Sequence, residues 1–359
     1  MNPKVSIIWL NYNSMKNIEV IESSLEGVCE LDYPNFELIV VDNGSEDGSF
    51  EFIRDFLNTK KCAKHKIIRL EENLGFCGGN NVGYRAMDPE SKYLVLLNND
   101  CVPEKDSLNN LVEFMEQYPE IASSQGVILS LKDERKIDTA GDYINEFLAT
   151  HAFLKGDKIS SIPNKPYLIS YADGCYSIYR VSAIKKLMGD KLFYDEFFAY
   201  FDDNFLGLKL WTHGFKVVAF PKIAGKHWRS MSFKLSPLQE YLDIRAHVAS
   251  LMISNSPYNN LILRKLLFSS FFVRDSIKPN FKKYRIILKA IRDGVNLGKS
   301  LVERDEFLDI NKVPKIKFDI KNTVNLIFRS ILLKRSLAEE ARLYGIKYIK
   351  NNIKSFYFD

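Results

Sequence analysis

Short apolar runs alternate with amphipathic segments of helical length through the first 130 residues of the chain. This alternation predicts βαβ units that build a mainly parallel sheet. Strands are predicted near residues 5–10, 37–42, 66–70, 93–98 and 121–129, and amphipathic helices at 48–59 and 105–118. The pattern therefore predicts an α/β fold for this part of the chain.

The pattern changes twice further along the chain. Residues 131–170 are polar and irregular, which predicts an insertion or a return hairpin. From Asp173 to Ser232 we predict a Gly-centred turn, two helical segments and a short strand at 216–220. After Pro237 the spacing of apolar and basic residues, for example at 261–272, predicts amphipathic helices. We place a domain boundary near residue 235, between an α/β domain (1–235) and a mainly helical region (236–359).

Three of the predicted strands run into polar residues. The first leads into Asn11-Tyr12-Asn13, the second into Asp42-Asn43-Gly44-Ser45, and the fourth into Asn98-Asn99-Asp100. Open α/β sheets bind their ligands at the carboxyl ends of the strands, so the three segments predict one shared site. Asp100 offers a hard anionic oxygen where a phosphate-bound cation would lie. Any one of these segments, taken alone, is equally typical of a plain turn.

A Gly-rich segment at 73–83 leads into a predicted helix. Backbone N–H groups in such a loop, together with a helix N-terminus, are suited to phosphate. The segment follows the third strand and its glycines do not fit G-x-G-x-x-G, and no G-K-[ST] follows, so neither a dinucleotide fingerprint nor a P-loop is present. Taken alone, it is a weak indication of phosphate binding.

Two further segments carry candidate chemistry. Asp202 and Asp203 begin an apolar helical stretch, where the helix dipole favours acidic residues. Adjacent carboxylates on a helix point in different directions, so one of them could act as a general base toward a hydroxyl. His227 could complete the protein ligands of a cation with Asp100, with diphosphate oxygens and water supplying the rest. A single His is nevertheless more often a packed or surface residue.

The composition is that of a soluble globular protein. The 359 residues are 46% hydrophobic and 26% charged, and they are enough for one large domain or two smaller ones. No apolar run approaches the roughly 18 residues of a membrane span, and the N-terminus lacks the pattern of a signal peptide. The five cysteines are an odd number without C-x-x-C spacing, so we expect reduced thiols in a cytoplasmic protein.

The net charge of +5 is unevenly distributed. From Ser236 to the end, 23 Lys and Arg stand against 12 Asp and Glu, which gives +11 and leaves −6 for the first 235 residues. The basic region could face anionic lipid at the inner side of a membrane or a phosphorylated acceptor, while nucleic acid is less supported. A solvated helical surface is an equally good interpretation.

Taken together and in this order, the segments resemble the family 2 glycosyltransferases, inverting enzymes of GT-A fold that use nucleotide-sugar donors. The resemblance extends over residues 3–232. It is carried by Val5-Ser6-Ile7-Ile8, 11–13, 41–48, 72–76, 78–81, 96–100, Gly174, 201–203 and His227. The Asn-x-Gly-Phe-x-Gly-Gly-Asn-Asn form at 73–81 is most similar to rhamnosyltransferase-type and galactofuranosyltransferase-type members. The resemblance implies a GT-A fold, with a Rossmann-like, mainly parallel sheet, followed by a helical C-terminal region.

The resemblance also implies roles for individual residues. Asp203 would be the catalytic base, and Asp100 and His227 would hold Mn²⁺ or Mg²⁺. Gly174, Asp202 and Trp228 would lie on the acceptor side. The donor would be bound by Asn11, Tyr12, Asn13, Asp42, Asn43, Asn73, Gly75, Gly79, Asn80, Asn81, Asn98 and Asn99.

The chain departs from the family pattern in two of these segments. Asn98 replaces the first Asp of the metal-binding D-x-D, and Phe205 stands where many members have a further acid. The Q-x-x-R-W signature of processive synthases is absent, so we expect transfer of one or a few sugars.

The expected activity is metal-dependent, inverting transfer from a UDP- or dTDP-sugar to a glycan or lipid-linked acceptor. The alternatives are a catalytically impaired partner subunit that binds nucleotide-sugar or glycan and, with less support, a sugar nucleotidyltransferase. The latter enzymes usually place a Gly-rich, basic loop after the first strand, where this chain has Asn11-Tyr12-Asn13.

Overall fold

The computed structural model describes residues 2–60, 62, 64–229, 236–257, 259, 281–318 and 337–358. The amphipathic helices predicted at 261–272 lie outside these ranges. The helices are α1 Ile18–Cys29, α2 Ser49–Thr59, α3 Gly75–Arg85, α4 Ser107–Gln117, α5 Val181–Met188, α6 Asp202–Thr212, α7 Pro237–Met252, α9 Phe281–Glu303 and α11 Leu337–Asn352. Short 3₁₀ segments are η1 Met15–Asn17, η2 Ile159–Ser161, η3 Asp195–Phe197, η4 Ile310–Lys312 and η5 Ile353–Phe356.

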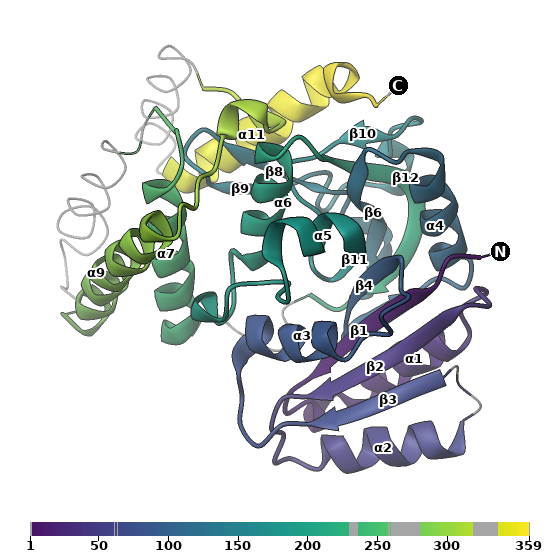
Figure 1. Cartoon of the computed structure of the whole chain (residues 1–359). Helices are drawn as coiled ribbons and strands as arrows, with labels where there is room; N and C mark the ends of the chain where they lie inside the picture. The colour runs from purple at the N-terminus through teal and green to yellow at the C-terminus, as the bar shows by residue number, and fades with distance from the viewer. Residues whose placement is uncertain are drawn as a thin grey trace.

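The N-terminal half forms the predicted parallel sheet. Strands β1 (Val5–Asn11), β2 (Phe36–Asp42), β3 (Lys64–Arg69) and β4 (Tyr93–Asn98) pair in parallel in the order β3-β2-β1-β4. Alternate residues of β1 enter different hydrophobic clusters: Ile8 lies with residues of α3, whereas Ile7 and Trp9 lie with residues of α1 and α2. Helices thus cover both faces, which explains why the central strands are continuous apolar runs (Figure 1).

Three more strands extend this sheet into the second half of the chain. β11 (Tyr176–Arg180) lies antiparallel between β4 and β6 (Ile121–Ser130), and β12 (Lys216–His227) pairs in parallel with β6. β12 begins where we predicted but continues seven residues beyond Phe220 to His227. Its end pairs with β5 (Cys101–Pro103), so that His227 lies opposite Cys101. The strand therefore carries His227 back to the end of β4.

Residues 131–170 include the return hairpin that their polarity predicted. β7 (Asp133–Thr139) runs back along β6, and β10 (Tyr167–Leu168) pairs with the edge of β12. β8 (Asp142–Asn145) lies between β9 (Thr150–Ala152) and β13 (Lys315–Ile316) in a second, small sheet. The insertion thus connects the main sheet to the C-terminal region.

The described C-terminal part is mainly helical, as predicted. α7 packs along α9, and α11 runs beside the small sheet (Figure 1). Ala246 of α7, Leu301 of α9 and Ile349 of α11 belong to the same hydrophobic cluster as Leu94 of β4. The domain boundary near 235 stays a prediction. In the described residues, no helix combines the length and apolar composition that crossing a bilayer requires.

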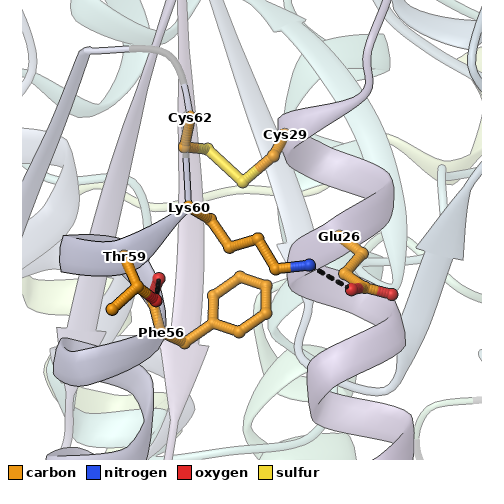
Figure 2. Close-up of a disulfide and its surroundings, with 6 residues drawn as sticks. All are labelled: Glu26, Cys29, Phe56, Thr59, Lys60 and Cys62. Carbon is orange, nitrogen blue, oxygen red and sulfur yellow. Dashed lines mark hydrogen bonds and ion pairs between the residues drawn. A yellow bond between two sulfur atoms is a disulfide. The ribbon is translucent and has the colours of Figure 1, made fainter.

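The expectation of reduced thiols is wrong for two cysteines. Cys29 at the end of α1 and Cys62 in the loop after α2 form a disulfide, with their Cα atoms 4.6 Å apart (Figure 2). The ion pair between Glu26 and Lys60, at 2.7 Å, joins the same two segments. The sequence separation of 33 between the cysteines gave no spacing signal, because only the fold brings the two segments together. Cys77, Cys101 and Cys175 are free and buried.

Replacing both Cys29 and Cys62 by Ser should lower the free energy of unfolding by about 3 kcal/mol, because the cross-link restricts a long loop in the unfolded chain. Urea unfolding under oxidising conditions measures this difference. Reductant should lower wild-type stability to that of the variant and leave the variant unchanged. An identical unfolding midpoint for the wild type with and without reductant would contradict the prediction.

Candidate active site

The ends of β1, β2 and β4 meet in one polar network centred on Asn11. The Asn11 Nδ2 donates to Asp42 Oδ1 at 2.8 Å and also to the hydroxyls of Ser45 and Ser49. Its Oδ1 accepts from Asn99 Nδ2 at 3.2 Å. The network lies where the strand order reverses beside β1, which is the usual ligand position in an open α/β sheet. The three segments that we predicted to form one site are therefore together.

The residues of this network differ in how far their side chains are exposed to a ligand. Asn11 and Asp42 are fully buried, and Asp42 Oδ2 also accepts from the Ser45 backbone N–H. Tyr12 is 40% exposed, and Asn13 is exposed at a left-handed φ of 44°. The Asn13 Oδ1 accepts from the Glu46 backbone N–H. Tyr12 is thus the side chain of these strand ends that is best placed to contact a ligand.

The Gly-rich segment is held against the β2 end by Asn43. The Asn43 Nδ2 donates to Asn73 Oδ1 at 2.9 Å and to the Gly75 carbonyl at 3.0 Å. Gly75 has φ 74°, and a Cβ there would lie 2.3 Å from the Phe198 carbonyl oxygen. A Cβ at Gly79 would lie 2.5 Å from the Leu10 side chain. These glycines therefore allow α3 to pack closely on β1 and on the turn at Phe198.

Asn80 and Asn81 make contacts within the fold. The Asn81 Nδ2 donates to the Phe193 carbonyl and to Asp195 Oδ1, both at 2.8 Å. Its Oδ1 accepts from the backbone N–H groups of Leu192 and Phe193. The Asn80 Nδ2 donates to the carbonyl of Phe76. Asn81 thus secures the segment that leads toward Asp202 and Asp203, and the donor-binding roles of both asparagines stay predictions.

Asp100 and His227 lie together although 127 residues separate them in the sequence. The His227 Nε2 is 3.1 Å from Asp100 Oδ1, and both side chains are buried. The pairing of β12 with β5 brings the two residues together, and the Trp228 backbone N–H donates to the Asp100 carbonyl at 2.9 Å. The Trp228 ring is half-buried and lies 5.1 Å from Lys132 Nζ. The backbone N–H of Asn98 donates to the carbonyl of Cys175, the residue just before β11.

Three charged residues that we did not predict complete this part of the site. The His227 Nδ1 is 2.9 Å from Asp138 Oδ2, and the Arg229 Nε donates to the same carboxylate at 2.8 Å. The Arg229 Nη2 reaches Asp173 Oδ2 at 2.6 Å. The proximity of Arg229 to His227 in the sequence could have drawn attention to it. Asp138 lies in the polar insertion and Asp173 in a predicted turn, with no local signal for either.

The charges around His227 favour its protonated, positively charged form. Burial lowers the pKa of His227, but its hydrogen bonds to Asp100 and Asp138 outweigh burial and raise the pKa to about 10. Burial raises the pKa of Asp138, whereas the His227 hydrogen bond and the Arg229 charge bring it below its usual value. Burial likewise opposes ionisation of Asp173, and Arg229 and His227 hold its pKa well below the usual range. The positive charges of Arg229 and His227 therefore favour the ionised forms of Asp138 and Asp173.

Asp100 and His227 fit the predicted metal-ligand pair. Two donor atoms 3.1 Å apart can contact one ion at about 2.1 Å from each. In the described residues, no group of three or more His, Cys, Asp and Glu could hold a metal. Mg²⁺ and similar ions commonly take one or two protein ligands and complete their shell with water and substrate phosphates. A His whose other nitrogen meets a carboxylate is typical of metal ligands.

The candidate base lies at the start of α6. Asp203 Oδ2 accepts from the Gly174 backbone N–H at 3.1 Å, and its Oδ1 accepts from the Asn204 N–H. Burial, followed by the charge of Asp173, raises the pKa of Asp202 to about 7. Burial and the charges of Asp202 and Asp173 raise the pKa of Asp203 well above its usual value. The pair can therefore hold a proton near neutral pH, as a general base requires.

The backbone just before this pair is strained. Phe198, Tyr200 and Phe201 have φ between 64° and 70°, a region that residues with a Cβ rarely adopt. Strain of this kind clusters at functional sites, where the surrounding structure holds it in place. Phe205, at the position where many family members have an acid, is buried with its ring 5.2 Å from that of Phe197. Its side chain belongs to the core beneath the site.

The comparisons with known sequences point to one family. Residues 6–188 match the model of Glycosyl transferase family 2. TuaG of Bacillus subtilis, a glycosyltransferase named for teichuronic acid biosynthesis, is 28% identical over 137 residues, which are 38% of this chain and 51% of TuaG. The poly-beta-1,6-N-acetyl-D-glucosamine synthase of Staphylococcus epidermidis is 30% identical over 122 residues, which are 34% of this chain and 28% of the synthase. The chain thus spans about half of TuaG and less of the synthase.

Solved structures confirm the predicted GT-A fold. The mannosyltransferase PcManGT of Pyrobaculum calidifontis, in complex with GDP-Man and Mn²⁺, aligns with a TM-score of 0.51 at 15% identity over 99% of this chain and 87% of its own. S. aureus TarS 1-349, in complex with UDP-GlcNAc, aligns with a TM-score of 0.52 at 16% identity over 98% and 92%. At this identity the likeness concerns the fold.

The contacts of the two asparagines generate a stability prediction. Asn81→Ala should lower the free energy of unfolding by about 2–4 kcal/mol, because it leaves several buried polar groups without partners. Asn80→Ala, which removes the bond to the Phe76 carbonyl, should cost only about 1 kcal/mol. Urea unfolding of both variants tests the difference, and equal losses would contradict it.

Proposed function

The chain belongs to glycosyltransferase family 2, and we propose that it transfers a sugar from a nucleoside-diphosphate donor to a hydroxyl of a glycan or lipid-linked glycan. The observation that carries this proposal is the Asp100–His227 pair, 3.1 Å apart at the ends of the strands and connected through buried charges to the loop that contacts Asp203. This arrangement supports a site for the donor diphosphate on one side and a base for the acceptor on the other.

The proposed reaction is a single displacement. Asp203 accepts the proton of the acceptor hydroxyl, whose oxygen attacks the anomeric carbon on the face opposite the nucleoside diphosphate and inverts that centre. Asp100 and His227 would hold Mn²⁺ or Mg²⁺, whose charge would stabilise the departing diphosphate. Gly174 orients Asp203 through its backbone N–H, and Asp202 raises the proton affinity of Asp203 through its charge.

Several observations support a nucleotide-sugar donor. TarS was solved with UDP-GlcNAc and PcManGT with GDP-Man and Mn²⁺. Tyr12, exposed beside the strand ends, is positioned to contact a nucleobase. The form of residues 73–81 supports a rhamnosyl- or galactofuranosyl-type enzyme with UDP or dTDP as the leaving group.

Asp203→Asn should lower kcat by a factor of about 10² to 10⁴, because the amide cannot accept the proton. Donor binding should persist, since Asp203 contacts the acceptor side. A thermal-shift panel of UDP, dTDP and GDP with Mn²⁺ measures binding, and a ligand at 100 times its Kd stabilises the fold by roughly 2.7 kcal/mol. Asp202→Asn is the comparison for the neighbouring carboxylate: it keeps the base, and because it removes a charge that raises the pKa of Asp203, its activity should persist to lower pH than that of the wild type.

The wild type should also lose activity as the pH falls, and at a higher pH than an ordinary aspartate base would, because burial and the charges of Asp202 and Asp173 raise the pKa of Asp203 and so favour its protonated form. Transfer that survives Asp203→Asn would contradict the assignment of the base. The absence of a melting shift with every nucleotide would contradict the donor and favour a non-catalytic glycan-binding partner.

We also propose that α9 contacts an anionic membrane surface. Its exposed residues Arg285, Lys289, Arg292 and Lys299 recur at intervals of three, four or seven, which places them on one face of the helix. Each basic residue near an anionic bilayer contributes about 1 kcal/mol. Location at the inner face of the membrane stays a prediction, and the Cys29–Cys62 disulfide weighs against a reducing compartment.

Replacing Arg285 and Lys299 together by Gln should weaken binding to phosphatidylserine-containing vesicles about 30-fold, from the loss of two such contributions. Flotation with vesicles of increasing phosphatidylserine content measures binding. The matched control replaces two exposed lysines of α5, Lys185 and Lys186, by Gln and should bind as the wild type does. Binding by the wild type that is independent of anionic lipid would refute the membrane contact.

A further inference from the structure

Asp138 occupies a position in this site that neither the motifs nor the family resemblance assigned. It lies near the end of β7, in the hairpin that returns along β6, and its side chain is buried. One carboxylate oxygen faces His227 Nδ1 at 2.9 Å, and Arg229 Nε contacts both oxygens at 2.8 and 2.9 Å. Lys155 Nζ is 4.0 Å away. Asp138 thus meets three basic groups, and His227 is the one that also faces Asp100.

This contact determines which nitrogen of His227 is available to a ligand. A neutral imidazole carries one proton, and an acceptor at one nitrogen keeps the proton there and leaves the other nitrogen with its lone pair. When a divalent cation takes the place of one proton of the charged ring, Asp138 beside Nδ1 keeps the other proton there, and the lone pair lies on Nε2, the nitrogen that faces Asp100 Oδ1. The same contact fixes the orientation of the His227 ring. Carboxylates in this position commonly orient metal-bound His residues.

Arg229 connects this contact to the other half of the site. Its guanidinium bonds Asp138 through Nε and Asp173 through Nη2. Asp173 precedes Gly174, whose N–H donates to Asp203. Asp173 Oδ1 also accepts from the Cys175 N–H, which fixes the loop around Gly174. Arg229, which also contacts the loop of the base, therefore fixes the position of Asp138, and Asp138 in turn fixes the position of His227.

We propose that Asp138 is a positioning residue that presents His227 Nε2 to the divalent cation, with Arg229 as the bridge between the cation side and the loop of the base. The inference rests on the proposed function, because it requires the cation that Asp100 and His227 would hold. It adds to that function a residue of the insertion at 131–170, which the hairpin brings to the site.

Asp138→Asn tests the proposal with little change in shape. We expect the affinity for Mn²⁺ in the presence of UDP to fall about 10- to 100-fold. Electron paramagnetic resonance of the unbound Mn²⁺ measures this affinity without turnover. Raising the Mn²⁺ concentration about 100-fold should restore most of the lost transfer activity, a rescue that a purely structural defect would not show.

Asp142→Asn is the matched control. Asp142 lies in the same insertion and is buried, but its carboxylate bonds Thr139 and Tyr171. Its replacement should leave the Mn²⁺ affinity within about twofold of the wild type, since Asp142 does not contact His227, the residue that would bind the metal. An equal loss in both variants would overturn the specific role of Asp138.

A measurement on the wild type makes the test independent of how the variants fold. In protein labelled with ¹⁵N-histidine and saturated with Mg²⁺ and UDP, His227 should carry its proton on Nδ1. A proton on Nε2 in that state would overturn the proposal. So would a folded Asp138→Asn variant that binds Mn²⁺ as tightly as the wild type. Failure of the wild type to bind Mn²⁺ with UDP would instead overturn the cation site itself, and this inference with it.

Discussion

The parallel pairing of β1 with both β2 and β4 determines where the site lies. The register places Asn11 opposite Asp42 on one side and Leu10 opposite Asn98 on the other. Apolar strands buried on both faces cannot slip by one residue without turning their side chains to the wrong face. The polar residues that follow them are consequently held at one edge of the sheet. The hydrogen bonds of Asn11 then join the strand ends into a single network.

The charges of the site are stabilised mainly by one another. Burying a carboxylate or a guanidinium costs several kcal/mol, which a partner in good geometry offsets. Arg229 bonds Asp138 and Asp173, and His227 lies between Asp138 and Asp100. Such a network contributes little to the net free energy of unfolding, but removing one member leaves the others without partners. The network instead fixes the positions of the candidate cation ligands and of the loop of the base, because both share the same buried contacts.

The strands of the first half were predictable from sequence because their signal is local. An apolar run such as that of β4 can be recognised in the sequence without knowing which residues it packs against. The hairpin after β6 was predicted from a change in polarity along the chain. The partners of His227 were different, because Asp138 lies 89 residues away and meets it only through the β6–β7 and β6–β12 pairings. The Cys29–Cys62 disulfide was missed for the same reason. The residue types in the motifs indicated the candidate base and the candidate cation ligands. Their charged neighbours, Asp138, Asp173 and Arg229, could be identified only once the fold was known.

The basic C-terminal region also has a role inside the molecule. Glu306, just after α9, accepts two hydrogen bonds from Lys209 of α6 at 2.7 and 2.8 Å, and both side chains are largely buried. The Tyr194 hydroxyl joins the same pair. Because α6 begins with Asp202 and Asp203, this ion pair connects the C-terminal segment to the helix that carries the candidate base. The segment after α9 and the helix that begins with the candidate base are therefore parts of one packed unit.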